Sequence, residues 1–211
     1  MNHLIIIAHP RKESLNYSIK NRIVDQQEAK GDKVKVRDLY QMKFRPILDY
    51  DELQYLKKGN ICPDILVEQS YILWANEITI IYPLWWNAFP AILKGYIDRV
   101  FTNGFAFKVS KNGVEGLLKD KKVRLITSAG MDEDSLKKIN LFDSLRATQD
   151  VGVFEFCGMK VIDHIYITES TGLSENQKMT ILDDIARKVD ESSLKENETA
   201  VRFPSEFSNG K

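Results

Sequence analysis

The sequence predicts an α/β fold, in which a five-stranded parallel sheet is covered by helices on both faces. Two observations lead to this prediction. Short runs rich in Ile, Val and Leu alternate with amphipathic segments along most of the chain. The runs are apolar at consecutive positions, as strands covered on both faces require. For five strands we expect the order 2-1-3-4-5, in which ligands bind beyond the carboxyl ends of the strands, at the point where the order reverses.

The elements follow one another in a regular way. We expect strands at residues 4–8, 33–38, 77–82, 122–127 and 161–167. Amphipathic spacing predicts helices at residues 15–23, 65–73, 92–101, 135–148 and 179–189, of which the fourth is the least regular. Pro63 and Pro90 fall near helix starts, where proline is tolerated, and Ser174 with Gln177 makes a capping box before the last helix. The long connection at 41–62 contains no clear element, and such connections are often functional.

Composition indicates a globular protein of one domain. Of the 211 residues, 43% are hydrophobic and 28% are charged, which is ordinary for a folded domain. Lys and Arg number 30, as do Asp and Glu, and the zero net charge argues against a nucleic-acid partner. Cys62 and Cys157 are the only cysteines and show neither a metal-ligand spacing nor a disulfide framework. We therefore expect no metal site and a reduced, cytoplasmic setting.

The ends of the chain give two further expectations. No apolar run approaches the length of a membrane span, and the amino terminus has no basic lead to suggest a signal peptide, so we expect no membrane insertion. We expect residues 1–191 to form the domain and the polar segment 192–211 to be a loosely ordered tail.

Three loops follow the first, third and fourth strands, where a ligand is expected. The first, residues 9–16, opens a helix, and a helix amino terminus suits a phosphate because its N–H groups are unpaired. Ser14 and Asn16 add side-chain donors, and His9 can donate across the loop. No Gly-x-Gly-x-x-Gly or Walker motif occurs, which disfavours a Rossmann dinucleotide site or a nucleotide triphosphatase. Taken alone, this loop favours a simpler interpretation, with Ser14 as an N-cap and His9 as a loop histidine.

The second loop carries two adjacent tryptophans, Trp85 and Trp86, after Pro83. Its indole faces and backbone groups could flank a flat heteroaromatic ring, although a buried aromatic cluster or a dimer contact explains this loop equally well. The third loop, residues 127–131, has small residues that let backbone approach a ligand. Two of its N–H groups could stabilise negative charge, but alone it is more typical of a plain turn. Together the three loops predict a site for a flavin nucleotide.

At these residues the chain resembles the NAD(P)H:quinone oxidoreductases, the DT-diaphorase-like family of the flavodoxin-like superfamily. The resemblance runs from Leu4 to about Leu182, and the block from Tyr82 to Phe107 is its most specific part. The matching segments are residues 8–9, 14–17, 38–40, 44, 46, 63–65, 68–69, 82–86, 90–95, 99–101, 105–106, 127–130 and 156–158.

The resemblance implies a homodimer with its active sites at the subunit interface, FAD as cofactor and NAD(P)H as electron donor. It implies two-electron, ping-pong transfer of hydride through flavin N5 to a quinone or related acceptor. The residues that it assigns to the cofactor are His9, Ser14, Leu15, Asn16, Ser18, Pro83, Leu84, Trp85, Trp86, Asn87, Thr127, Ser128, Ala129 and Gly130. The residues that it assigns to catalysis and the substrate pocket are Trp86, Phe107, Gly130 and Met159.

Some positions depart from the family pattern. Mammalian members carry a Tyr and a His after the fourth-strand loop, whereas residues 131–139 contain neither. We therefore expect no side chain to act as general acid, and backbone N–H groups of Ala129 and Gly130 to stabilise negative charge on the reduced flavin. Trp86 stands at the family's tryptophan position and Trp85 where Gln is common, so Trp86 should meet the ring or the substrate.

Other functions stay open at this point. FMN is the alternative cofactor, because residues 112–117 resemble the azoreductases, and an FMN azoreductase-like enzyme is one alternative. A regulatory ancillary subunit of a potassium-efflux system, from the same superfamily, is another, although the balanced charge offers no sign of a basic docking patch. A flavodoxin-like electron carrier is disfavoured, because that class is usually strongly acidic.

Overall fold

The sheet has the predicted strand order. The computed structural model describes residues 1–111 and 113–200, with side chains up to residue 191. The strands pair in parallel in the order β2-β1-β3-β6-β7. Their bounds, each close to the expected one, are β1 (Asn2–Ile7), β2 (Lys33–Asp38), β3 (Glu77–Pro83), β6 (Lys122–Ser128) and β7 (Lys160–Ile167).

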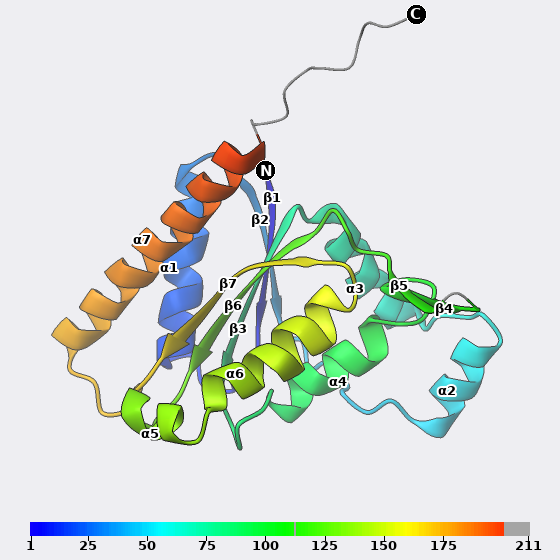
Figure 1. Cartoon of the computed structure of the whole chain (residues 1–211), viewed down its shortest axis with the longest axis horizontal. Helices are drawn as coiled ribbons and strands as arrows, with labels where there is room; N and C mark the ends of the chain where they lie inside the picture. The colour runs from blue at the N-terminus through cyan, green and yellow to red at the C-terminus, as the bar shows by residue number, and fades with distance from the viewer. Residues whose placement is uncertain (112, 201–211) are drawn as a thin grey trace, which may run out of the picture.

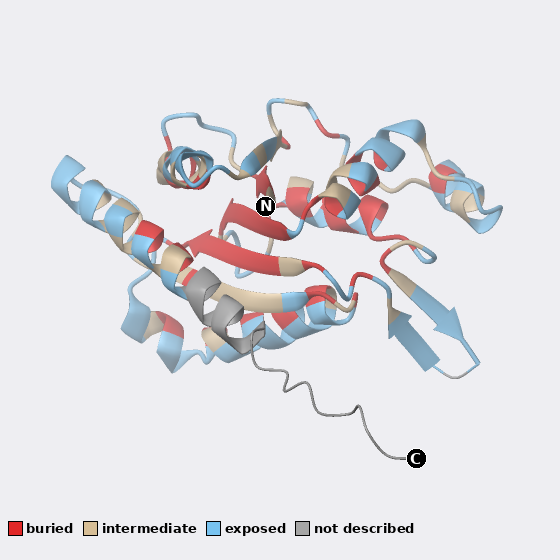
Figure 2. Ribbon diagram, turned by 90° about the horizontal axis from the view of Figure 1, so that it is seen from above, coloured by how far each residue is buried: buried red, intermediate tan, exposed pale blue. Residues whose placement is uncertain are grey.

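Helices cover both faces of this sheet (Figure 1), as predicted. On one face lie α1 (Leu15–Ala29) and α7 (Glu175–Ala200); on the other lie α3 (Pro63–Trp74), α4 (Ala91–Val100) and η1, a π-helix (Arg146–Glu155). The central strands are buried almost throughout (Figure 2). Side chains of β1 alternate between the two cores: Ile5 and Ile7 pack beneath α1 and α7, and Leu4 and Ile6 pack on the opposite side.

Helix starts follow the signals in the sequence. The Ser174 N–H donates to Gln177 Oε1 at 2.9 Å, and the Gln177 N–H donates to Ser174 Oγ at 3.3 Å, which confirms the capping box. Pro63 is the first residue of α3, and Pro90 immediately precedes α4. Both prolines therefore stand where a helix needs no N–H from them.

The prediction of one helix over 135–148 is wrong. The chain forms two short helices, α5 (Glu133–Lys138) and α6 (Leu141–Leu145), separated at Asn140. Asn140 has a φ of 56°, a left-handed conformation that Asn tolerates but that a right-handed helix cannot contain. From α6 the chain continues directly into η1, beyond the expected end.

One helix and one hairpin were not predicted. α2 (Tyr50–Lys57) lies within the long connection, and a hairpin of β4 (Phe107–Ser110) and β5 (Gly113–Gly116) follows α4. Both are short and mostly exposed, so neither has the apolar periodicity that reveals a buried element.

The carboxyl-terminal helix extends past the expected end of the domain. α7 continues to Ala200, across the expected start of the tail at residue 192, while residues 201–211 lie outside the described part of the chain. Within the described ranges, no helix has both the length and the apolar character that a membrane span requires.

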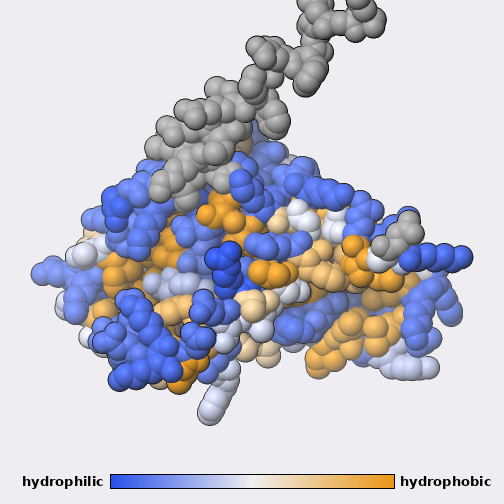
Figure 3. Space-filling model, viewed as in Figure 1, coloured by the Kyte–Doolittle hydropathy of each residue, from blue (hydrophilic) through white to orange (hydrophobic). Residues whose placement is uncertain are grey.

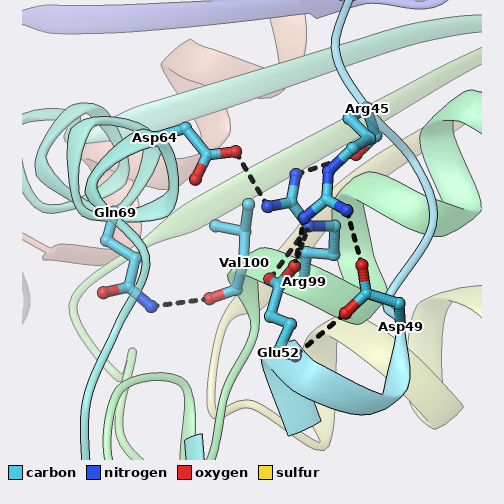
Figure 4. Close-up of polar contacts among 7 residues, drawn as sticks. All are labelled: Arg45, Asp49, Glu52, Asp64, Gln69, Arg99 and Val100. Carbon is cyan, nitrogen blue, oxygen red and sulfur yellow. Dashed lines mark hydrogen bonds and ion pairs between the residues drawn. The ribbon is translucent and has the colours of Figure 1, made fainter. Parts of the chain in front are cut away.

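A buried arginine ties α2 to the rest of the molecule (Figure 4). Arg99, on α4, is fully buried, and its Nε donates to the two Glu52 carboxylate oxygens at 2.9 and 3.0 Å. Its Nη2 donates to Asp64 Oδ2 at 2.8 Å, and its Nη1 donates to Arg45 O at 2.8 Å. Arg45 also pairs with Glu52 at 2.8 Å. Because buried charges need partners, Arg99 fixes α2 and the connection before it.

Replacing Arg99 by Met should destabilise the protein by about 3 kcal/mol. The reason is that the buried Glu52 carboxylate keeps only Arg45 as a charged partner. Urea unfolding followed by circular dichroism would measure the loss. The double variant Arg99→Met/Glu52→Leu removes both charges and should recover most of the stability; a double variant no more stable than the single one would contradict this account.

Stability should also fall in mild acid because of His3. The His3 ring is fully buried and its Nε2 lies 2.9 Å from Thr79 Oγ1. Burial lowers the pKa of His3 to about 4, so between about pH 6.5 and 4 the unfolded chain binds a proton that the folded chain does not. The stability present above about pH 6.5 is therefore lost as the pH falls, by about 3 kcal/mol in total.

The His3→Gln variant is the control for this pH effect. Unfolding free energies of both proteins between about pH 7 and 4 should differ most at the acid end, because Gln binds no proton. A difference that does not change with pH would show that His3 does not cause the effect.

Candidate active site

The loops after β1, β3 and β6 meet at one edge of the sheet, as predicted (Figure 1). Two backbone hydrogen bonds extend the strand pairing into these loops. The Ala8 N–H donates to Ile81 O at 2.9 Å, and the Leu84 N–H donates to Ser128 O at 2.7 Å. We call this surface, made of residues 8–16, 83–90 and 127–132, the loop cluster.

Ser14 caps the amino terminus of α1 within the loop cluster. Its Oγ accepts a hydrogen bond from the Tyr17 N–H at 3.4 Å, so the simpler interpretation of Ser14 as an N-cap is confirmed. Its hydroxyl hydrogen can still serve as a donor. Leu15 and Asn16 follow in the first turn, where backbone N–H groups have no acceptor within the helix. Ser18 lies one turn further and donates to Ser14 O at 3.5 Å. The turn can therefore bind an anion, such as a phosphate.

Asn16 provides evidence for a ligand that is independent of the motif. The residue is 1% exposed, and its Oδ1 has no hydrogen-bond partner in the part of the chain that the structure describes. Buried polar atoms almost always have a partner. A hydroxyl group of a ligand bound at the loop cluster could supply one, and the ribityl chain of a flavin carries such hydroxyls.

His9 links the first loop to the second. Its Nδ1 lies 3.1 Å from both the backbone nitrogen and the carbonyl oxygen of Arg11, and its ring centroid lies 6.2 Å from that of Trp85. Burial lowers the pKa of His9. The ring is therefore neutral at pH 7, and its Nε2 can donate a hydrogen bond to a ligand or accept one, according to the tautomer.

The tryptophan pair forms a tight turn at the tip of the second loop. Trp85 and Ala88 pair as an isolated bridge, and the two residues between them, Trp86 and Asn87, have φ angles of 52° and 55°. Two consecutive positive φ angles define a type I′ turn. Pro83, at the end of β3, is buried and Leu84 is half-buried. The turn therefore projects from a fixed base.

Trp86 combines a strained backbone conformation with an exposed side chain. Its side chain is 99% exposed, against 42% for Trp85. A residue with a side chain in the left-handed region costs about 1–2 kcal/mol, and Asn bears this better than Trp. Strain of this kind is typical of binding sites. The indole of Trp86 is therefore available to a ligand or a second protein surface.

The third loop differs from expectation in one respect. The Ala129 N–H donates to Ile167 O at 2.8 Å, so the prediction that it stabilises charge on a ligand is wrong. The Gly130 N–H has no hydrogen-bond partner among the described residues, and Gly130 is exposed. Thr127 and Ser128 are buried, and Thr127 Oγ1 donates to Tyr82 O at 3.3 Å. Only one of the two expected N–H donors is therefore available.

The four residues expected in catalysis do not come together in one chain. Trp86 and Gly130 lie in the loop cluster. Met159 is 3% exposed, belongs to the core beneath α3 and α4, and precedes β7, at the opposite edge of the sheet. Phe107 opens β4, where its ring centroid lies 5.3 Å from that of Phe156. Within the chain, Trp86 and Gly130 therefore lie apart from Phe107 and Met159.

The structure adds a cavity that sequence reasoning missed. It has a volume of about 420 Å³ and lies between the end of β7 and the start of α7. Its wall residue Thr171 would lie 3.7 Å from a Cβ placed on Gly130, so the cavity adjoins the third loop. It is lined by Thr168, Glu169, Thr171, Gly172, Leu173, Gln177, Thr180 and Ile181. The small polar residues after the last strand are the sequence feature that could have indicated this cavity.

Comparisons with known proteins agree with this architecture. A family model described as a flavodoxin-like fold matches residues 1–192. An uncharacterized NAD(P)H oxidoreductase from Haemophilus influenzae is 44% identical over 164 residues, which cover 77% of this chain and 81% of that one. NAD(P)H dehydrogenase (quinone) 1 from Cavia porcellus is 36% identical over 180 residues, which cover 76% of this chain and 66% of that one. The solved NAD(P)H:quinone oxidoreductase from Methanothermobacter marburgensis superposes with a TM-score of 0.78 at 26% identity, covering 89% of this chain and 96% of that one.

Replacing Trp86 by Gly should stabilise the ligand-free protein by about 0.5–1 kcal/mol, because Gly adopts a positive φ without strain. The matched control is Trp85→Gly. Trp85 has no positive φ and contacts His9, so its loss should destabilise the protein. Thermal unfolding of the ligand-free variants would rank them, and a Trp86→Gly protein as unstable as Trp85→Gly would contradict the strain argument.

Proposed function

This chain belongs to the family with a flavodoxin-like fold, and from that premise we propose that it transfers electrons from NAD(P)H to a quinone or related acceptor through a bound flavin. Its relatives are oxidoreductases by name. One observation carries the proposal: the loop cluster joins an anion-binding helix start to a fully exposed tryptophan. The buried, unpartnered Asn16 oxygen lies at the same helix start.

The loop cluster would hold the flavin by several kinds of contact. The first turn of α1, with Ser14 and Asn16, suits its phosphate and ribityl chain. The turn at Trp86 would flank the ring system, and Gly130 would face its edge. A bound flavin supplies the acceptor and the donor of hydride. The protein supplies orientation, and the exposed indole gives NAD(P)H and the oxidising substrate a common surface in turn.

A backbone N–H group, rather than an acidic side chain, would stabilise the negative charge of the reduced flavin. The Gly130 N–H could stabilise negative charge on the ring edge. Asp132 is committed elsewhere: its carboxylate accepts hydrogen bonds from the Ser135 N–H at 2.9 Å and the Ser135 hydroxyl at 2.7 Å, and these bonds lower the pKa of Asp132. Glu133 pairs with Lys137 at 2.6 Å. With its lowered pKa, Asp132 is not suited to donate a proton near neutral pH, so the proton would come from solvent.

FAD fits this site better than FMN. The cavity at the end of β7 adjoins Gly130 and, at about 420 Å³, offers space beyond the loop cluster for the adenine half of the cofactor. FMN would leave that cavity without a role.

A homodimer would complete the site. Phe107 and Met159 lie away from the loop cluster, whereas Val109 and Val114 on the hairpin and Phe156 beside it are exposed. Figure 3 shows apolar surface over the β4–β5 hairpin. In a pair of chains related by a two-fold axis, the hairpin of each chain would contact the tryptophan turn of the other. The symmetry makes this contact occur twice.

The test is to purify the protein, record its visible spectrum and identify the released flavin by mass. We expect a yellow protein that releases FAD and oxidises NAD(P)H when menadione is supplied. Release of FMN would correct the cofactor alone. A yellow protein without turnover would refute the reductase proposal, and a colourless protein that takes up no added flavin would refute the site.

The tryptophans give a matched pair of variants for the same assay. Trp86→Ala should lower flavin affinity or turnover by at least about tenfold, because its exposed indole is free to stack on the ring. Trp85→Ala should have a smaller effect, since that residue contributes mainly through its backbone. The reverse order would refute the assignment of Trp86 to the ring.

A further inference from the structure

An acidic side chain lies beside the anion-binding turn of α1, at the end of the neighbouring strand. Asp38 is the last residue of β2 and stands opposite Ile7 in the strand pairing. The Leu39 N–H donates to Ile7 O at 3.0 Å, and the loop cluster begins directly after Ile7. Among the side chains described, up to residue 191, Asp38 forms no ion pair. Its charge is therefore balanced in another way.

Two hydrogen bonds take the place of an ion pair. Asp38 Oδ1 accepts from the Gln41 N–H at 3.0 Å, in the turn that follows β2. Asp38 Oδ2 accepts from the Tyr17 hydroxyl at 2.5 Å. Burial and the hydrogen bond to Asp38 raise the pKa of Tyr17 above its ordinary value. The hydroxyl therefore keeps its hydrogen near neutral pH and serves as a permanent donor.

The same tyrosine belongs to the turn that would bind the flavin phosphate. Tyr17 is the third residue of α1, its side chain is buried, and its N–H donates to the capping Ser14 Oγ at 3.4 Å. It directly follows Asn16, whose buried Oδ1 has no partner among the described residues. Tyr17 therefore connects the anion-binding turn to the carboxylate at the end of β2.

A carboxylate at this place opposes the binding of an anion at the helix start. Like charges repel, and salt screens a half-buried charge such as Asp38 less than an exposed one. The charged side chains of the first loop, Arg11, Lys12 and Glu13, are all exposed. A hydroxyl that donates to a carboxylate forms a charge-assisted hydrogen bond, which offsets part of the negative charge. Of the two donors to Asp38, only Tyr17 comes from α1.

We propose that Tyr17 is a positioning residue that makes the site selective for a phosphorylated flavin, because it holds the Asp38 carboxylate in a hydrogen bond. This inference rests on the proposed function. The hydroxyl fixes one carboxylate oxygen and offsets part of its charge, so a phosphate at the first turn of α1 meets less repulsion. Without the hydroxyl, Asp38 keeps only the Gln41 N–H as a donor, and its second oxygen stays uncompensated beside the anion site.

The test compares FMN with riboflavin, which lacks the phosphate that FMN shares with FAD. Quenching of flavin fluorescence on flavin-free protein gives both dissociation constants, and their ratio reports the contribution of the phosphate. Tyr17→Phe removes only the hydroxyl. It should weaken FMN binding by at least about fivefold and change riboflavin binding by less than about twofold. The loss for FMN should shrink between about 0.05 and 0.5 M salt, because screening weakens the repulsion.

Removing the charge should restore the binding of FMN. Asp38→Asn keeps the shape of the side chain and an acceptor for the Gln41 N–H, but it is neutral. The double variant Tyr17→Phe/Asp38→Asn should therefore bind FMN within about twofold of the wild type. A double variant as weak as Tyr17→Phe would overturn the proposal, because a neutral residue does not repair lost packing. An unchanged affinity of Tyr17→Phe for FMN, or an equal loss for both flavins, would also overturn it.

Tyr40→Phe is the matched control. Tyr40 lies in the turn after β2 and is half-buried, and its hydroxyl has no hydrogen-bond partner in the described part of the chain. This variant should leave both affinities unchanged, whereas a loss equal to that of Tyr17→Phe would contradict the role of Asp38. Thermal unfolding would verify that all four variants fold.

Inorganic phosphate gives a measurement that does not require flavin. A ligand that binds the folded state raises the unfolding temperature. Phosphate, compared with potassium chloride of equal ionic strength, should raise it more in the wild type and in the double variant than in Tyr17→Phe. This pattern in a protein that binds neither flavin would refute the proposed function and support the link from Tyr17 through Asp38 to the anion site. A response that is the same in all three proteins would overturn that link.

Discussion

Parallel pairing of β3 with β1 on one side and with β6 on the other determines where each loop of the candidate site lies. Because the three strands run in the same direction, their carboxyl ends reach the same edge of the sheet. The pairing continues past the strands through the bonds from Ala8 to Ile81 and from Leu84 to Ser128. A slip of one residue in β3 would turn its side chains to the opposite faces and would separate Leu84 from Ser128. The site therefore depends on the register.

Hydrogen bonds at the carboxyl ends of these strands explain how the strained turn persists. Trp86 and Asn87 both have positive φ angles, and the residues on either side of them are held by the Trp85–Ala88 bridge and by the bond from Leu84. Strain survives only where the surrounding structure imposes it. The sheet therefore presents the Trp86 indole to solvent at a defined position, and the strained backbone at that position costs the chain some stability.

The four residues that the family resemblance assigns to catalysis lie in different parts of the molecule. Trp86 and Gly130 stand at one edge of the sheet, whereas Met159 is buried near the other and Phe107 lies on the hairpin. No rearrangement of one sheet can unite them, because a strand's two ends lie at opposite edges.

The sequence by itself determined the alternation of strands and helices, the caps at Ser14 and Ser174, and the three loops, because these depend on local periodicity and side-chain chemistry. Only the tertiary structure decided which polar groups remain available. The Ala129 N–H is taken by Ile167, and His164 meets Asp150 and Tyr82 from separate elements. Such partners are distant in sequence and are brought together by packing, so no local pattern reveals them.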